Sequence, residues 1–554
     1  MALGVAILAC QDGTTPGPEI DPELMGGSAV CSKTFALTNG NPGAATVGFE
    51  VTTSGETGEL SLPARPEDGQ ESVTTLATVT SGSLRVTFEG ALVEEIGASG
   101  AACPPPSPAP QPQASIGRWA APFAWPVIAV HLHLLPSGRV LSWGKGGEPQ
   151  VWDPVTGAFA EVPSATRIFC AGHAFLPDGR LMVAGGHISN DHGLPDANLF
   201  DPQTEDWVTV APMARGRWYP TVTTMPSGRP VVLAGRDQNQ IDVLEPEVWT
   251  GSSWRTLTAA PRSLPYYPRA FVAPNGLLFY AGELRQSAYL DPSGDGSWID
   301  VASSLYGQRD YGSAMMYRPG RVLIVGGSNP PNGAPTATAE VIDLNAGGPA
   351  WHYTGSMANA RRHLNATLLP DGRVLATGGT SSAGFSDPTG AVHAAEVWNP
   401  ATGDWSTWAS NAVTRVYHGT SLLLPDGRIL NSGSGDGAGV TDERNAELFS
   451  PPYLFRGARP VIVRAPLSIR YGQSFSVATP DAGRVVRASL VRLGSVTHAF
   501  DQNQHFLELE LRRSAGGVTL TVPEGATLAP PGHYMLFLLN SYGVPSVARI
   551  VRLS

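Results

Sequence analysis

The chain has 554 residues, which suggests about three or four domains. Apolar residues make up 42% and charged residues 15%, so the chain can form a large core and is not disordered as a whole, while 64 Gly and 49 Pro indicate frequent turns. The net charge of −11 argues against nucleic acid or an anionic membrane as the main partner, because both require a basic surface, and without an apolar run of about 20 residues we expect no transmembrane span.

The first 25 residues resemble an export leader. An apolar stretch ends in small residues at Cys10, and a Pro/Gly-rich segment follows. The segment Ile7-Leu-Ala-Cys10 is similar to a bacterial lipoprotein cleavage box, in which Cys10 would carry lipid. The alternative is an ordinary apolar N-terminus with an inert thiol.

Residues 26–103 are expected to form a small β domain, because short alternating segments such as Thr46–Val51 lie between two cysteines. In an exported chain, Cys31 and Cys103 would form a disulfide; the alternative is two free thiols. Residues 104–117 begin with a proline-rich stretch that indicates a stiff linker.

From His131 onward the chain repeats one phrase, a Pro/Gly turn followed by a short β-branched run and glycines. Its intervals of 41, 49, 48, 45, 51 and 55 residues and its glycine pairs are typical of kelch repeats. The turn prolines are Pro136, Pro177, Pro226, Pro274, Pro319, Pro370 and Pro425.

The fold class is therefore all-β. Seven such units predict a seven-bladed kelch propeller over residues 118–456. Further alternating strands predict a C-terminal Ig-like β-sandwich over residues 457–554.

Reactive side chains recur at one register of the repeat. Cys170, Tyr219 and His418 each precede their turn proline by seven residues, and Tyr417 stands next to His418. Equivalent positions in a closed ring meet at one end of its axis, so we expect these groups to face one pocket. His498, in the C-terminal domain, would join them only if a hairpin from that domain entered the axis.

Taken singly, each of these residues is explained as part of the core. Together they are not, because a scaffold has no reason to place a thiol, a phenol and an imidazole at one register. Two tyrosines and two histidines offer N and O ligands that suit copper.

The chain resembles the copper-radical oxidase family of galactose oxidase and glyoxal oxidase over roughly residues 118–554. The resemblance is carried by Phe169-Cys-Ala-Gly172, Arg217-Trp-Tyr-Pro-Thr221, Arg415-Val-Tyr-His418, Ser450-Pro-Pro-Tyr-Leu454, Val496-Thr-His498 and Pro531-Gly-His-Tyr534.

This resemblance implies a thioether between Cys170 and Tyr219, with the crosslinked phenolate as an equatorial copper ligand. It also implies His418 and His498 as imidazole ligands and Tyr417 as axial ligand and general base. The Tyr219 radical would abstract hydrogen from the substrate carbon, copper would take an electron, and dioxygen would reoxidise both, giving hydrogen peroxide.

Other positions fit this pattern less directly. His505 competes with His498, but the family's histidine directly follows a threonine, which favours His498. In galactose oxidase an indole covers the crosslinked ring, whereas here Arg236-Asp-Gln-Asn-Gln240 contains no tryptophan. Trp218 precedes Tyr219, but the sequence does not show whether it stacks there.

Four further histidines have weaker interpretations. His131 and His133 alternate on a first-blade strand and are expected to be structural, although they could bind metal together. His187 and His192 flank a loop that could border the substrate entrance.

We therefore expect a monomeric, secreted or cell-surface copper oxidase that acts on aldehydes, primary alcohols or carbohydrate ends with dioxygen. The alternative is a kelch-type carbohydrate-binding or adhesion protein with a non-catalytic site. A third option is an active copper site that modifies an extracellular matrix.

Overall fold

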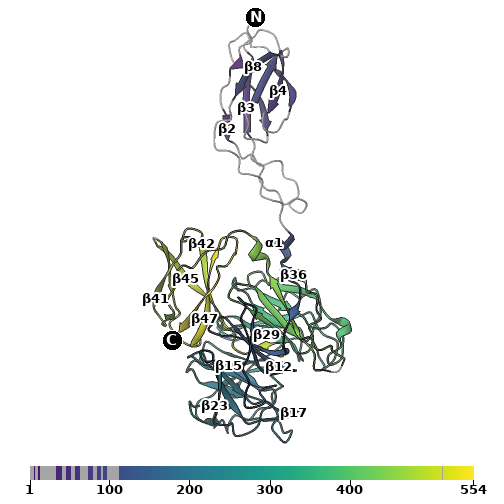
Figure 1. The fold of residues 1–554 in the computed structure, drawn as a ribbon, viewed down its shortest axis with the longest axis vertical. Coiled ribbons are helices and arrows are strands. Elements are labelled where there is room, and N and C mark those ends of the chain that lie inside the picture. Colours follow the sequence, from purple (N-terminus) through teal and green to yellow (C-terminus); the bar gives the residue numbers. More distant parts are fainter. Residues whose placement is uncertain are drawn as a thin grey trace. The chain divides into compact units, whose positions relative to one another are not determined.

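A computed structural model describes residues 112–554, except positions 438 and 515, and eight strands in the preceding part of the chain. The chain divides into two compact units, Met1–Pro110 and Gln111–Ser554 (Figure 1). No helix among the described residues has the length and apolar character needed to cross a membrane.

The described strands of the first unit form two antiparallel sheets. One has the order β1-β3-β2, with β6 also paired to β3, and the other has the order β5-β4-β7-β8. The strands are β1 Val5–Ala6, β2 Cys10–Asp12, β3 Lys33–Asn39, β4 Ala45–Val51, β5 Thr57–Leu62, β6 Val73–Thr78, β7 Leu84–Phe88 and β8 Ala91–Ile96. Cys31 and Cys103 lie outside the described residues, as does most of the expected leader, and the side chain of Cys10 is not described.

The second unit confirms the seven-bladed propeller, in which each blade is an antiparallel sheet. The first three blades are β11 Ile128–Leu134, β12 Val140–Lys145, β13 Gln150–Trp152 and β14 Phe159–Glu161; β15 Gly172–Phe175, β16 Leu181–Ala184, β19 Ala197–Asp201 and β20 Asp206–Val210; and β21 Thr221–Thr224, β22 Pro230–Leu233, β23 Glu247–Trp249 and β24 Trp254–Thr256. The next three are β25 Arg269–Val272, β26 Leu278–Gly282, β27 Gln286–Asp291 and β28 Ser297–Ser303; β29 Ser313–Arg318, β30 Arg321–Val325, β31 Ala339–Asp343 and β32 Trp351–Thr354; and β33 Asn365–Leu368, β34 Val374–Thr377, β35 Ala394–Trp398 and β36 Trp405–Ser410.

The seventh blade closes the ring with strands from both ends of the propeller segment. It combines β37 Gly419–Leu423, β38 Ile429–Gly433 and β39 Asn445–Ser450 with β9 Arg118–Trp119 and β10 Phe123–Ala124. Both β9 and β10 pair with β39, so residues more than 300 positions apart share one sheet. Short elements complete this unit: α1 Pro112–Ile116, the hairpin β17 His187–Ser189 and β18 His192–Gly193, and the 3-10 helices Pro388–Gly390 and Pro452–Phe455.

The repeated turn phrase joins the first two strands of every blade. Its glycine has a positive φ in all seven copies: Gly138, Gly179, Gly228, Gly276, Gly320, Gly372 and Gly427, between +73° and +96°. Other residues rarely adopt this conformation, which explains why glycine recurs at the turn.

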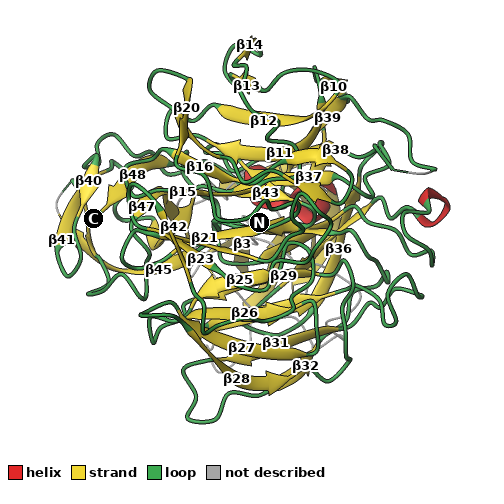
Figure 2. Ribbon diagram, turned by 90° about the horizontal axis from the view of Figure 1, so that it is seen from below, coloured by secondary structure: helices red, strands yellow, loops and turns green. Residues whose placement is uncertain are grey.

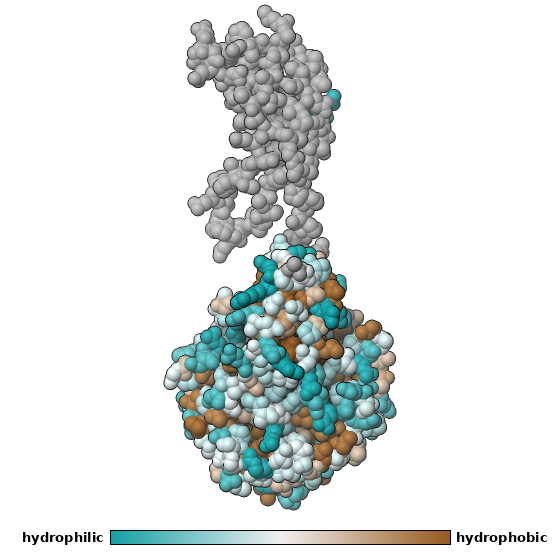
Figure 3. Space-filling view, turned by 90° about the vertical axis from the view of Figure 1, so that its left-hand side faces the viewer, coloured by the Kyte–Doolittle hydropathy of each residue, from teal (hydrophilic) through white to brown (hydrophobic). Residues whose placement is uncertain are grey.

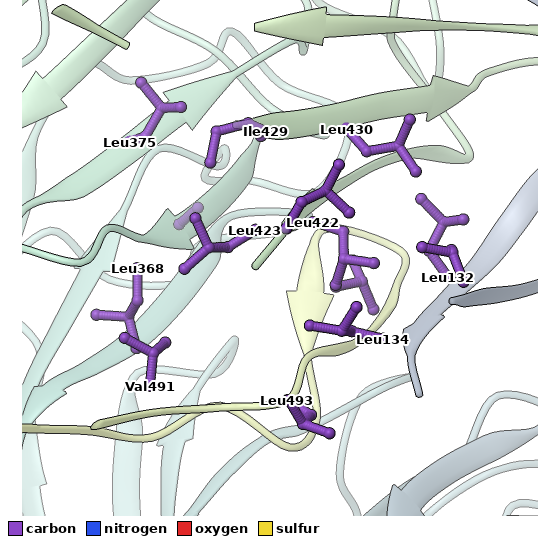
Figure 4. Packing of buried hydrophobic residues seen from close by; sticks show 14 of the residues in the cluster. Leu132, Leu134, Leu368, Leu375, Leu422, Leu423, Ile429, Leu430, Val491 and Leu493 are labelled. Carbon is purple, nitrogen blue, oxygen red and sulfur yellow. The ribbon is translucent and has the colours of Figure 1, made fainter. Parts of the chain in front are cut away.

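The C-terminal domain confirms the expected β-sandwich and packs on the propeller. Its strands are β40 Ser468–Ile469, β41 Ser474–Ala478, β42 Val485–Arg492, β45 Phe506–Ser514, β46 Gly517–Thr521, β47 Gly532–Asn540 and β48 Arg549–Leu553. In Figure 4, Val491 and Leu493 of this domain lie beside Leu134, Leu368 and Leu422 of the propeller, in one buried cluster. The two domains therefore share part of their core.

A hairpin of β43 Ser495–Thr497 and β44 Phe500–Asp501 leaves the C-terminal domain and pairs with β11, the first strand of the first blade (Figure 2). Its two turn residues, His498 and Ala499, have φ values of +44° and +65°, as in a tight two-residue hairpin turn. The hairpin that His498 requires is therefore present.

Glutamine side chains anchor this hairpin to the inner strands of other blades. The Gln502 Oε1 accepts backbone N–H bonds from His173 at 3.0 Å and Val222 at 2.9 Å. The Gln504 Oε1 accepts the N–H of Met316 at 3.0 Å. These bonds satisfy buried donors that would otherwise destabilise the propeller.

Asp501, at the base of this hairpin, provides a test of its contribution to stability. Burial raises its pKa to about 6, although its carboxylate accepts N–H bonds from Ser495 and Asn503. The raised pKa favours the folded state below the unfolded-state value near 4, and this advantage disappears as pH rises through about 6. We expect Asp501→Asn to raise the free energy of unfolding by on the order of 1–3 kcal/mol at pH 7 and by almost nothing at pH 4, measured by urea titration. A gain of equal size at both pH values would contradict this.

The surface of the second unit is mixed in character. On the face that Figure 3 shows, hydrophilic and hydrophobic side chains alternate in small groups. Such a surface is typical of a protein in contact with water.

Candidate functional site

The candidate site is built at one end of the propeller axis by residues that directly precede inner strands. Cys170, Tyr219 and His418 have positive φ values of 64°, 64° and 67°. Non-glycine residues in this conformation are strained and often mark functional positions. All three are buried, as are Tyr417 and His498.

The tyrosine and histidine side chains converge. The Tyr219 Oη lies 2.6 Å from the Tyr417 Oη and 3.4 Å from the His418 Nε2. The His498 ring lies 4.5 Å from the Tyr219 ring and 4.6 Å from the His418 ring, measured between centroids. Cys170 packs in one cluster with Tyr219 and Trp218. The structure thus brings together all five residues expected from the sequence.

Hydrogen bonds fix the orientation of both imidazoles. The His418 Nδ1 lies 2.7 Å from the Gly435 carbonyl and therefore donates to it, which leaves the Nε2 lone pair free. The Thr497 hydroxyl donates to the Val130 carbonyl, so its oxygen accepts the His498 Nδ1–H at 2.7 Å. The His498 Nε2 is buried without a partner, which would be costly unless a ligand binds it.

Burial also sets the protonation of the site. It lowers the pKa of His418 to about 4 and that of His498 well below its usual value, so both rings are neutral near pH 7. It raises the pKa values of the Tyr219 and Tyr417 phenols and of the Cys170 thiol. Neutral imidazoles can bind a metal, while the phenols require a nearby cation to ionise.

This donor set fits copper. The Tyr219 Oη lies within hydrogen-bond distance of the Tyr417 Oη and the His418 Nε2, and the His498 ring lies beside them. Such mixed N and O ligands suit that metal. The donated Nδ1–H bonds are the outer contacts that metal-binding histidines commonly make. In the described part of the chain, no group of three or more His, Cys, Asp or Glu side chains could hold a metal ion, so the candidate site depends on its phenol oxygens as well as its imidazoles.

An indole covers the ring of Tyr219, although it does not come from the segment after Gly235. Trp218 stacks on Tyr219 with ring centroids 3.6 Å apart and an interplanar angle of 7°. Its Nε1 donates to the His187 Nδ1 at 3.2 Å. The stacking partner is therefore the residue directly before Tyr219, held by a histidine of the β17–β18 hairpin.

Two hollows border the site. A groove of about 570 Å³ is lined by Lys145, Phe169, His187 and Asp436, among others. A second hollow of about 250 Å³ is lined by Tyr267, Tyr311 and His498. His187 thus borders a groove beside the site, whereas His192 does not line either hollow and bonds to Ser189 within its own hairpin.

Three further axial residues were not singled out from the sequence. Tyr267, Tyr311 and His363 also have positive φ values, and each precedes its turn glycine by nine residues, as Cys170, Tyr219 and His418 do. Tyr267 stacks on His498 at 4.5 Å, and the His363 ring lies 5.4 Å from the Tyr417 ring. Tyr267 and His363 also precede their turn prolines by seven residues, so the count that gave Cys170 contains them, whereas only Tyr311 requires the count from the glycine.

His131 and His133 do not meet the candidate copper ligands as a metal pair. Both are fully buried and stack on Trp143, with centroid distances of 4.9 and 4.3 Å. His505 is also away from the ligands, and its Nε2 bonds to the Leu528 carbonyl.

Comparisons with known proteins identify similar chains. Residues 459–553 match the galactose oxidase-like early set domain. A galactose oxidase of Gibberella zeae is 30% identical over 496 residues, covering 80% of this chain and 71% of that protein. The aldehyde oxidase GLOX of Vitis pseudoreticulata is 28% identical over 474 residues, covering 76% of this chain and 89% of that protein. A fungal alcohol oxidase of the AA5 family, solved in complex with copper, shares the fold with a TM-score of 0.73 at 24% identity, covering 79% of this chain and all of that one.

Proposed function

This chain belongs to the galactose oxidase family of copper-radical oxidases, and from that premise we propose that it oxidises aldehydes or primary alcohols, including carbohydrate ends, and reduces dioxygen to hydrogen peroxide. The observation that carries the proposal is the convergence of the Tyr219 and Tyr417 hydroxyls with the His418 Nε2 and with the His498 ring, whose Nε2 has no partner.

In this proposal Tyr219, Tyr417, His418 and His498 hold copper. Bound copper would supply one-electron redox chemistry and a position for the substrate oxygen. The chain itself would supply a stored radical on Tyr219. Trp218, stacked at 3.6 Å, would exclude water from one face of that ring.

Tyr417 is suited to act as the general base. Burial raises the pKa of its phenol, so a phenolate formed there takes up a proton readily. In the proposed reaction the Tyr417 Oη accepts the substrate hydroxyl proton, and the Tyr219 Oη, 2.6 Å away, takes the hydrogen atom from the adjacent carbon.

We propose that Cys170 and Tyr219 form a thioether. A C–S bond replaces the S–H and one ring C–H, and the two electrons and two protons reduce one dioxygen to hydrogen peroxide. Packing of the Cys170 side chain in the same buried cluster as Tyr219 supports this step.

The decisive experiment is intact-mass and optical spectroscopy of the copper-loaded protein. The expected result is a mass lower by the two lost hydrogens and, after oxidation, a radical absorption that is absent from the matched variant Cys170→Ser. Copper-loaded protein with no mass loss, and no peroxide formed from any aldehyde or alcohol, would overturn the proposal.

We also propose that the protein works outside the cell, either secreted or at the cell surface, as a monomer. The leader-like first 25 residues support export. Retention of labelled lipid by Cys10 would distinguish an anchored protein from a released one.

A further inference from the structure

Beside the candidate ligands, three buried side chains form a continuous chain of hydrogen bonds. His131 lies in β11 of the first blade, His173 in β15 of the second, and Ser495 in β43 of the inserted hairpin. All three are 0% exposed. The chain therefore connects three separate elements that meet at the axis.

The direction of these hydrogen bonds follows from one fixed donor. The backbone N–H of Cys170 donates to the His131 Nε2 at 3.2 Å, so the proton of the neutral His131 ring is on Nδ1. His131 Nδ1–H then donates to the His173 Nε2 at 2.9 Å, which places the His173 proton on Nδ1. His173 Nδ1–H in turn donates to the Ser495 Oγ at 2.7 Å.

Each imidazole thus has a single tautomer that satisfies all its partners. Burial lowers the pKa of His131 well below its usual value and that of His173 to about 3, so both rings stay neutral in ordinary buffers. Trp143 stacks on His131 and meets His173 edge-on, which restricts both rings further.

The two ends of this chain are the elements that carry reactive groups. One end is the backbone of Cys170, which has a strained φ of +64°. The other element is the hairpin, where Ser495, whose Oγ also lies 2.9 Å from the His133 Nδ1, stands three residues before His498. Backbone pairing joins the hairpin to β11 only, whereas the His173–Ser495 bond ties it to the second blade, which holds Cys170.

We propose that His131, His173 and Ser495 are positioning residues whose ordered hydrogen bonds hold the Cys170 loop and the His498 hairpin in register. Only the consequence of this coupling, faster thioether formation, rests on the proposed function. The coupling itself does not. The coupling is a property of the copper-free chain.

The test compares Ser495→Ala with Ser489→Ala. Ser489 is a matched control, because it is also a buried serine of the C-terminal domain, and its Oγ donates to the Pro370 carbonyl of the propeller at 2.6 Å. Amide hydrogen exchange is measured on copper-free protein by mass spectrometry of peptides that contain Cys170 or His498. We expect Ser495→Ala to speed exchange in both peptides by about tenfold, and Ser489→Ala to change neither.

The second measurement is the rate of two-hydrogen mass loss after copper and dioxygen are added. Ser495→Ala should slow it by about tenfold, Ser489→Ala should not, and Ser495→Thr, which retains the hydroxyl, should restore most of the rate. Unchanged exchange in Ser495→Ala, or equal changes in both alanine variants, would overturn the inference. If exchange changes as expected but the parent protein never loses mass, the proposed function fails and the coupling stands.

Discussion

Replacing Tyr219 with phenylalanine is expected to abolish peroxide formation, with a loss of at least about 10³-fold in turnover. The substitution removes one hydroxyl, and with it the phenol oxygen that lies 2.6 Å from the Tyr417 Oη and 3.4 Å from the His418 Nε2. Without that oxygen the ring can neither bind copper nor form a phenoxyl radical. Copper-loaded Tyr219→Phe should therefore show no radical absorption on oxidation.

Tyr267→Phe is the matched control for this substitution. Tyr267 occupies the same register one blade later, is equally buried, and packs 4.8 Å from the Tyr219 ring, but its hydroxyl donates to the Ala171 carbonyl. It should retain the radical absorption and most of the turnover. Peroxide production by Tyr219→Phe at the level of Tyr267→Phe would contradict the assigned role of Tyr219.

The repeat made the fold predictable. The turn glycine has a positive φ in all seven phrases, a conformation that other residues rarely adopt, so these phrases mark seven first hairpins regardless of how the outer strands vary. Ring closure by β9 and β10 was harder to predict from the sequence, because these two-residue strands carry no periodic pattern of their own.

The same register predicted that Cys170, Tyr219 and His418 would meet. The prediction was incomplete, because Tyr267 and His363 stand at the same count from their prolines but were not singled out, and Tyr311 falls outside that count. In the fifth blade the proline directly precedes Gly320 instead of standing two residues before its glycine, so the proline count misses Tyr311. The glycine is the better reference, because its backbone conformation and not its side chain fixes the turn.

The orientation of the side chains could not be predicted from the sequence. Nothing in the order Trp218-Tyr219 shows that both rings stack, because that arrangement depends on the left-handed backbone of Tyr219 and on the bond from the Trp218 Nε1 to His187. Likewise, His131 and His133 were expected to be structural residues, but the pairing of their strand with the hairpin from the C-terminal domain, and the bond from the Cys170 N–H to His131, could not be predicted. Long-range contacts of this kind leave no local pattern.

The second large expected effect concerns copper binding by His498, which lies on the hairpin from the C-terminal domain. His498→Ala should weaken copper binding by at least about 100-fold, because it removes one of two neutral imidazole ligands and leaves three donors. The lost atom is the His498 Nε2, which is buried and has no protein partner. The measurement is competition between the protein and a copper chelator of known affinity at pH 7.

His505→Ala controls for the loss of a buried histidine near the same hairpin. The His505 ring is buried, and its Nε2 bonds to the Leu528 carbonyl, so its removal should destabilise the C-terminal domain without changing copper affinity. Equal copper affinity in the two variants would show that His498 is not a ligand. Since the His498 ring is carried by a different domain from the other three donors, loss of affinity in His498→Ala alone would mean that neither domain completes the copper site without the other.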